Sequence, residues 1–304
     1  MRTYNDSHPA PYKIDTFELG NEQENPNFLA QVQAIEARRA AIPGAPEWYF
    51  MYPENAGPSA AVAASLVAAG VEGRRIMADC HVGASGGIGC SEQTLIWQSF
   101  NGSGINCETN AVTSNLIRGA EEAADLLQWF NQPADVTARL RARTASFCIQ
   151  RSGQMRDMWD QGLSFFLPNM TWLQPPGAVH ALMAATWQPN ALRTAVTGGG
   201  SWFSGAAQQS DDGKTLVVQL VNGAWGHTPG AVDITVTGFT PRPAVDFWLL
   251  AEPGAGDVNT TAGNTPAAPG YISAVKSALT WPATGALHID LPPLGFAVLV
   301  LTSA

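Results

Sequence analysis

Charged residues are scarce in this chain of 304 residues. They make up 13% of the sequence, lysine is rare among them, and the net charge is −9. Proteins that bind nucleic acid or an anionic membrane surface carry basic patches that attract phosphate groups. This chain has too few cations for such a patch, so we expect neither nucleic acid nor a membrane among its partners.

Long apolar runs and cofactor motifs are also missing. No apolar run approaches about 18 residues, the length of a membrane-spanning helix. The first residues, Met1–Tyr12, are polar and contain proline, so no signal peptide is expected there. The glycine-rich segment Gly83–Gly89 has no phosphate-binding lysine, and no dinucleotide-binding fingerprint links a strand to a helix. We therefore expect no bound cofactor.

Cysteines are few as well. The four cysteines cannot build a disulfide scaffold, and their spacing does not fit a zinc site, so no metal centre is expected. Cys80 and Cys90 flank the glycine-rich loop. A single disulfide between them and buried free thiols both fit this pattern.

Two features that are present favour a secreted, sugar-binding protein. Ten tryptophans provide flat faces that can stack on sugar rings, although packing in the core accounts for most of them. Four Asn-x-Ser/Thr triplets favour an extracellular or secretory location. These triplets begin at Asn5, Asn101, Asn169 and Asn259.

From Lys13 to about Trp187, short apolar runs alternate with helical patterns, which is typical of βα units. A closed (β/α)8 barrel needs eight such units and this region offers five, so residues 1–193 are predicted to form a partial TIM barrel. Strands are expected at Lys13–Leu19, Glu47–Met51, Arg75–Asp79, Gly104–Cys107 and Thr144–Ile149. Helices are expected at Asn27–Ala41, Ser59–Ala69, Ser91–Phe100, Asn115–Phe130 and Gly177–Trp187.

After about Arg193 the pattern changes to strands separated by turn residues, with no convincing helix. Residues 194–304 are therefore predicted to form a separate antiparallel β-sandwich. Its strands are expected at Thr215–Val221, Val232–Val236, Val245–Leu250, Leu287–Leu291 and Phe296–Leu301.

Two glutamates lie just past the ends of predicted strands. Glu22 comes after the strand that ends at Leu19, and Glu108 comes after the strand that ends at Cys107. A barrel keeps its catalytic groups at the carboxyl ends of its strands. Cleavage of a glycosidic bond needs two carboxyl groups, one protonated and one ionised. The pair therefore predicts a glycoside hydrolase, and the residues alone leave open which glutamate takes which role.

Further candidates lie near other strand ends. Asn21 could hydrogen-bond a sugar hydroxyl, and so could His81, which follows the strand that ends at Asp79. A structural histidine fits the pattern of His81 equally well. Trp172 and Gln174 could provide a stacking face and a bidentate amide, whereas a buried tryptophan is the alternative for Trp172.

Cys107 adjoins Glu108 without a base partner in the sequence, so we expect it to be structural and not a nucleophile.

The motifs together resemble the α-L-arabinofuranosidases of glycoside hydrolase family 51, within the retaining (β/α)8 clan. Gly20-Asn21-Glu22 is similar to the family's acid/base motif after the fourth barrel strand. Cys107-Glu108-Thr109 is similar to the nucleophile motif after the seventh strand, His81 to a histidine after the sixth, and Gln174 to a glutamine near the eighth. The resemblance implies that Glu22 is the general acid/base and Glu108 the nucleophile.

The resemblance extends into the predicted sandwich. Thr215–Asn222, Asn264–Ile272 and Leu291–Phe296 look like segments of the family. Strands 4 to 8 of the barrel are thus matched and the first three are not, which implies an amino-terminally truncated enzyme. A barrel with open edges is expected to aggregate or to oligomerise.

The resemblance implies an exo-acting enzyme that releases terminal α-L-arabinofuranosyl residues from an arabinose-containing oligo- or polysaccharide. A β-xylosidase or an endoglucanase of the same clan is one alternative. A non-catalytic carbohydrate-binding remnant is another, because the barrel does not close.

Overall fold

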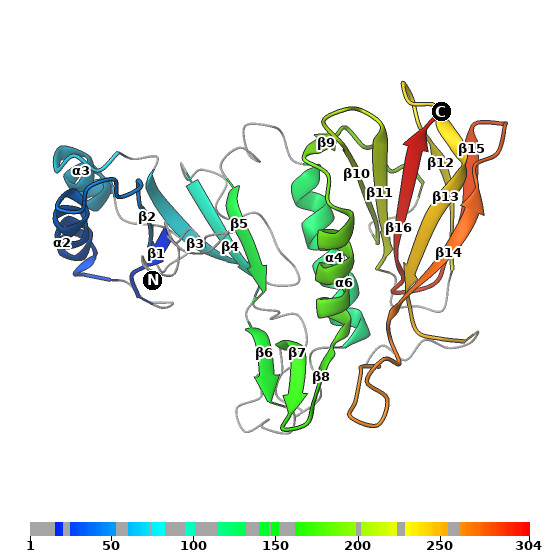
Figure 1. Cartoon of the computed structure of the whole chain (residues 1–304), viewed down its shortest axis with the longest axis horizontal. Coiled ribbons are helices and arrows are strands. Elements are labelled where there is room, and N and C mark those ends of the chain that lie inside the picture. The colour runs from blue at the N-terminus through cyan, green and yellow to red at the C-terminus, as the bar shows by residue number, and fades with distance from the viewer. Residues whose placement is uncertain are drawn as a thin grey trace. The chain divides into compact units, whose positions relative to one another are not determined.

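The structure is a computed structural model of the chain that divides into two compact units (Figure 1). Unit 1 comprises Met1–Val82, Gly87–Ser99 and Ala138–Thr144, and unit 2 comprises the rest. The described residues are 16–20, 25–52, 60–72, 75–82, 95–100, 115–131, 140–145, 147–151, 162–198, 202–223, 229–254 and 262–304. For residues 60, 78–82, 95–100, 140–145 and 147–151 the description covers the backbone alone.

Unit 1 is built on a five-stranded sheet in which the strand order follows the chain order. β1 pairs with β2 and β2 with β3, both in parallel. The strands are β1 (Thr16–Glu18), β2 (Tyr49–Tyr52), β3 (Ile76–Val82), β4 (Leu95–Phe100) and β5 (Leu140–Ala145). Parallel neighbours in chain order require crossover connections, and helices provide them here.

Helices α2 (Phe28–Ala40) and α3 (Ala60–Ala68) are these crossovers between β1, β2 and β3. Both were expected from the spacing of their apolar residues. Phe28 and Val32 of α2 and Leu66 of α3 are fully buried with Phe50 of β2 in one hydrophobic cluster. The alternation of strand and helix predicted for this region is thus present in β1–α2–β2–α3–β3.

One predicted helix is wrong. The segment Ser91–Phe100 was expected to be helical, whereas Leu95–Phe100 is strand β4. A short apolar run that contains isoleucine, tryptophan and phenylalanine fits a strand as well as a helix, and periodicity cannot separate the two at this length. The strand predicted at Gly104–Cys107 lies outside the described residues, and the one predicted at Thr144–Ile149 corresponds to β5 and to β6 (Phe147–Arg151).

Among the described residues of unit 2 are two helices, α4 (Leu116–Phe130) and α6 (Pro175–Thr186), that lie side by side and run in the same direction. Near their amino ends, a Cβ added to Gly119 would lie 3.1 Å from the Cβ of Pro175. At their carboxyl ends, the rings of Phe130 and Trp187 lie 5.6 Å apart between centroids. Parallel neighbouring helices are the arrangement of successive βα units in a barrel.

A small sheet precedes α6. β6 pairs in parallel with β7 (Gly162–Leu167), and β7 pairs antiparallel with β8 (Met170–Leu173). The chain passes from β8 directly into α6, and the backbone N–H of Gln174 donates to the carbonyl of Leu163 at 2.8 Å. The first turn of α6 lies so close to β7 that a side chain at Gly177 would collide with that carbonyl. The sequence did not predict β7 or β8.

The carboxyl-terminal third is antiparallel, as predicted. A six-stranded sheet has the order β14-β13-β16-β11-β10-β9, and β12 pairs with β15 in a second sheet. Every predicted strand of this region is present, and β9, β10 and β14 are additional. The strands are β9 (Asn190–Leu192), β10 (Phe203–Gln209), β11 (Thr215–Asn222), β12 (Gly230–Thr235), β13 (Pro241–Leu250), β14 (Ala274–Thr280), β15 (Ala286–Leu291) and β16 (Phe296–Ser303).

The two faces of the six-stranded sheet contribute to different cores. Val217 and Val298 share a buried cluster with Leu127 of α4 and Val179 of α6. On neighbouring positions of the same strands, side chains such as Leu299 share a second cluster with residues of β12 and β15. Alternate side chains of a strand point to opposite faces, so one sheet can serve both cores.

Helices α4 and α6, predicted as part of the barrel, therefore share a core with strands that come after residue 193. The contact-based division places both helices and the antiparallel strands in unit 2. The division into a barrel domain 1–193 and a β-sandwich domain 194–304 stays a prediction.

Candidate active site

The candidate active site is the carboxyl edge of the parallel strands of unit 1. In the pairing of β1 with β2, Thr16 lies beside Tyr49 and Glu18 beside Met51. Tyr52, the last residue of β2, lies beside Ala78 of β3. Because the strands are parallel and in this register, the segments that leave β1 and β2 begin at the same edge.

Hydrogen bonds fix Leu19, which directly follows β1, and Asn25. The N–H of Leu19 donates to the carbonyl of Met51 at 3.2 Å, which continues the pairing one residue past β1. The carboxamide of Asn25 donates to the carbonyl of Leu19, and the N–H of Asn25 donates to the hydroxyl of Tyr52 at 3.3 Å. Leu19 and Asn25, which stand on either side of residues 20–24 in the sequence, therefore both lie at the carboxyl edge of β1 and β2.

Gly20, the first residue after Leu19, has a φ of 139°, a conformation that side-chain-bearing residues rarely adopt. The glycine of the Gly-Asn-Glu motif thus has a conformational reason to be where it is. Asn21 and Glu22 follow it and lie outside the described residues. Their place in the site stays a prediction.

The other predicted residues of unit 1 are described in part. His81 lies in β3, three positions beyond Ala78 toward the carboxyl end, and the description there covers the backbone alone. Asp79 and Cys80 are in the same strand, and there too only the backbone is described. Glu108 and Cys107 lie outside the described residues, and so does Cys90.

Trp172 and Gln174 belong to unit 2, where both side chains are buried. The indole N–H of Trp172 and the amide of Gln174 both donate to the carbonyl of Asn264, at 3.1 and 2.8 Å. The amide oxygen of Gln174 accepts from the N–H of Asn264 at 3.0 Å. The structure thus brings these two predicted residues together on the backbone of Asn264, and their contact with a sugar stays a prediction.

Asn264 is the residue that sequence reasoning missed here. Its own carboxamide donates to the carbonyls of Leu173 and Ile272 at 2.7 and 2.8 Å, and it accepts from the N–H of Ile272 at 2.7 Å. The Asn-Thr-Pro sequence marks a turn, but nothing in it indicates a partner about ninety residues away in the chain.

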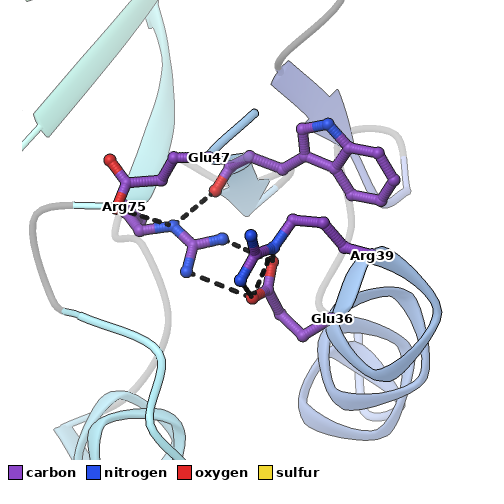
Figure 2. Close-up of polar contacts among 5 residues, drawn as sticks. Glu36, Arg39, Glu47 and Arg75 are labelled. Atoms are coloured by element: carbon purple, nitrogen blue, oxygen red, sulfur yellow. Dashed lines mark hydrogen bonds and ion pairs between the residues drawn. The ribbon is translucent and has the colours of Figure 1, made fainter. Parts of the chain in front are cut away.

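The most extensive group of charges among the described residues of unit 1 surrounds Arg75 (Figure 2). Its guanidinium pairs with both carboxylate oxygens of Glu36, and its Nε donates to the carbonyl of Trp48 at 2.6 Å. Arg39 forms an ion pair with the same carboxylate, with an N–O distance of 3.0 Å. A carboxylate oxygen of Glu47 lies 3.9 Å from Nε of Arg75.

This Arg75 cluster lies at the edge opposite the candidate active site. Arg75 directly precedes β3 and Trp48 directly precedes β2, while Glu36 is near the carboxyl end of α2. Burial acts to raise the pKa of Glu36, but hydrogen bonds from Arg75 and Arg39 outweigh it and hold the pKa below the usual range. In a barrel the amino edge of the strands contributes stability and the carboxyl edge chemistry, so we assign this cluster a structural role.

Helix α4 carries a second group of acids that the sequence analysis did not single out. Burial raises the pKa of Glu121, which Arg118 offsets in part, and one carboxylate oxygen of Glu121 has no hydrogen-bond partner. The neighbouring Glu122 is buried and pairs with His180 of α6. Perturbed carboxyl groups occur in active sites and in structural networks alike. The pairing across two packed helices favours the structural role for Glu122.

Metal and membrane binding can be examined for the same part of the chain. No group of three or more histidine, cysteine, aspartate or glutamate side chains among the described residues could hold a metal ion. None of the helices within the described ranges is both long and apolar enough to cross a membrane.

Comparison with known proteins gives a fold likeness without a sequence match. Neither a protein-family model nor a curated protein matches the sequence. An arabinose-bound GH51 α-L-arabinofuranosidase superposes with a TM-score of 0.69 at 17% identity, over 98% of this chain and 47% of that one. The α-L-arabinofuranosidase of Thermotoga maritima, in complex with arabinose, gives a TM-score of 0.65 at 14% identity, over 99% and 68% of the two chains.

A GH30 xylanase from Clostridium acetobutylicum is also similar, with a TM-score of 0.55 at 12% identity over 95% of this chain and 66% of that one. These likenesses confirm the predicted resemblance at the level of the fold, and they are consistent with a partial barrel. The chain spans just under half the length of the first of these arabinofuranosidases.

Proposed function

We propose that the chain is the catalytic part of a glycoside hydrolase that releases terminal α-L-arabinofuranosyl residues with retention of configuration. The observation that supports this most is that Leu19 and Asn25 are anchored at the carboxyl edge of a parallel sheet. The Gly-Asn-Glu motif lies between them in the sequence, in a chain whose fold is similar to that of arabinofuranosidases. Secretion and a β-sandwich after residue 193 belong to the same proposal.

In the proposed mechanism, Glu22 protonates the glycosidic oxygen while Glu108 attacks the anomeric carbon. The bond to the leaving oxygen breaks, and a covalent glycosyl-enzyme forms on Glu108. Water then attacks the same carbon, Glu22 takes its proton, and arabinose leaves with the original configuration. This route requires the two carboxyl groups to lie about 5–5.5 Å apart, whereas an inverting enzyme needs about 6.5–9.5 Å for a water molecule.

The sugar would be held by side chains near the two glutamates. Asn21 and His81 follow or end strands of the parallel sheet and are proposed to bind sugar hydroxyls. Trp172 and Gln174 have less support in this role, because their polar atoms already bind Asn264 and both side chains are buried. The substrate class is an arabinose-containing oligo- or polysaccharide.

A second candidate function keeps the two glutamates and changes the sugar. The likeness to a GH30 xylanase favours a β-xylosidase or an endo-acting enzyme on a xylose or glucose polymer. A non-catalytic carbohydrate-binding protein is the third candidate, favoured by the share of the arabinofuranosidase length that the chain spans.

Chromogenic arabinofuranosides, xylosides and glucosides, assayed with the full chain, separate these candidates. We expect turnover of the arabinofuranoside and a loss of at least about a thousandfold on substitution of either glutamate, since each supplies several kcal/mol of transition-state stabilisation. Glu24→Ala is the matched control, because this carboxylate lies in the same segment outside the motif.

Azide distinguishes the roles of the two glutamates. It should rescue Glu108→Ala and give a glycosyl azide of inverted configuration, because a small anion can occupy the space of the missing nucleophile. With Glu22→Ala the azide product should retain its configuration. The opposite pattern would exchange the two roles, and turnover of xylosides alone would favour the second candidate. Binding of arabinan without any turnover would favour the third.

A further inference from the structure

Strands β7 and β8 form a hairpin with a two-residue turn. Leu167 pairs with Met170, so Pro168 and Asn169 are the turn residues. Neither of these two residues has a positive φ, and proline at the first central position suits a turn of type I or II because its φ is already fixed near the required value. Figure 1 shows the tip of this hairpin pointing away from helix α6, which follows β8.

Asn169 and Thr171 are both exposed. Thr171 of β8 lies beside Phe166 of β7. The next residue, Trp172, is buried, so Thr171 is on the face of the strand that solvent reaches. The side chains of Asn169 and Thr171 are therefore both accessible in the folded protein.

These two residues are the first and third of an Asn-x-Ser/Thr triplet, Asn169-Met170-Thr171. The other three triplets, at Asn5, Asn101 and Asn259, lie outside the described residues. Such triplets arise by chance, and many are buried or lie within rigid structure. In this one, an exposed turn carries the asparagine and an exposed strand position carries the threonine. A bulky, polar group is tolerated at such a position.

We propose that Asn169 is an acceptor for N-linked glycosylation when the chain passes through a secretory pathway. The co-reactant is an oligosaccharide linked to a lipid diphosphate, supplied with its transferase by that pathway. The Nδ2 atom of Asn169 forms a bond to the anomeric carbon of the first sugar, and the bond from that carbon to the diphosphate oxygen breaks. The amide loses one proton to a base of the transferase, and the lipid diphosphate is the leaving group.

Translation of the full chain with microsomal membranes tests this proposal. The chain carries an added secretory signal, and a linker with a known acceptor triplet reports that translocation and glycosylation have taken place. We expect Asn169→Gln to lose one glycan-sized step in electrophoretic mobility, and an endoglycosidase to abolish that difference from the unsubstituted chain. Thr171→Ala should lose the same step, whereas Thr171→Ser should keep it.

Because Asn169 and Thr171 are exposed, these substitutions should leave the melting temperature almost unchanged. A glycan on the linker combined with equal mobility of the unsubstituted and Asn169→Gln chains would overturn the proposal. Electrophoretic mobility and melting temperature are both independent of hydrolytic activity. This proposal can therefore fail while the proposed function stands, and the proposed function can fail while this proposal stands.

Discussion

Each of the two units contains a polar cluster that is wholly or partly buried, and the two clusters differ in chemistry. In unit 1, Arg75 joins α2 to the amino ends of β2 and β3 through a carboxylate and a carbonyl. In unit 2, Asn264 makes six hydrogen bonds between neutral groups. Four of them join the segment after β13 to β8 and the start of α6, and two join Asn264 to Ile272 within that segment.

The difference between the Arg75 cluster and the Asn264 cluster decides how each responds to its surroundings. A buried ion pair stabilises only while both charges are present, because removing one leaves the other uncompensated. Neutral amides have no titration in the accessible range, so the hydrogen bonds of Asn264 should be insensitive to pH. The Arg75 cluster should therefore weaken in acid at a point where the Asn264 cluster does not.

The largest effect is expected from Asn264→Ala. The change removes three side-chain hydrogen bonds and leaves the carbonyl of Leu173 and both backbone groups of Ile272 without these partners. We expect a loss of about 3–5 kcal/mol in the free energy of unfolding, since each buried unsatisfied group costs about 1–3 kcal/mol. Urea denaturation measures it. Asn190→Ala is the matched control: Asn190 makes two hydrogen bonds on the surface, and its loss should cost at most about 0.5 kcal/mol.

Arg75→Met should have the next largest effect. Methionine keeps much of the apolar stem but removes the charge that faces Glu36, and Arg39 still contacts that carboxylate. We expect a loss of about 3 kcal/mol, the lower end for a broken buried pair. Hydrogen exchange should rise in α2 and β2 and stay unchanged in residues 262–272. Faster exchange in both places would mean that the two clusters are not independent.

Acid should weaken the Arg75 cluster by less than the substitution does. The pKa of Glu36 is lower in the folded chain than its ordinary value, so the unfolded chain binds the proton more readily. The stabilisation is complete above the ordinary carboxyl pKa and disappears as the pH falls through the folded pKa. Urea midpoints measured across that interval should fall in the unsubstituted chain. In Glu36→Gln this part of the pH dependence should be absent, and an unchanged slope would contradict the assignment.

The smallest effect is expected at His288, on the exposed face of β12 and β15. A hydrogen bond of 2.8 Å to Asp233 raises the pKa of His288 above its usual value, with a further contribution from Asp290. The stabilisation is present below the ordinary histidine pKa and is lost as the pH rises through the folded one. Titration by NMR should show the raised pKa, and Asp233→Asn should bring it back toward the usual value. A titration that Asp233→Asn leaves unmoved would contradict this origin.

The sequence predicted helices well where apolar residues recur at helical spacing. Helix α4 begins within one residue of its expected start, because Asn115 caps it through a side-chain bond to the N–H of Arg118. The helix predicted at Ser91–Phe100 was wrong, because the six residues that form β4 are too few for periodicity to distinguish a strand from a helix. The hairpin of β7 and β8 was not predicted, because its strands of six and four residues are too short for a clear period.

The candidate site shows the same limit. Gly20, Asn21 and Glu22 could be predicted to follow a strand, because an apolar run ends just before a turn residue. The hydrogen bond from the N–H of Asn25 to the hydroxyl of Tyr52 could not be predicted, since it depends on how β1 and β2 pair. The likeness to arabinofuranosidases in the fold was anticipated from the motifs alone, at an identity of 17% or below with the two compared.

Local order was determined by the sequence itself: which segments are helical, where turns fall, and which residue types the glutamate motifs contain. These properties depend on neighbours within a few positions, whose spacing the chain fixes directly. Only the tertiary structure decided that Gln174 and Trp172 bind Asn264, that Arg75 faces Glu36, and that α4 and α6 share a core with the antiparallel sheet. Such contacts join residues tens of positions apart, and each depends on the packing of whole elements, which no local pattern encodes.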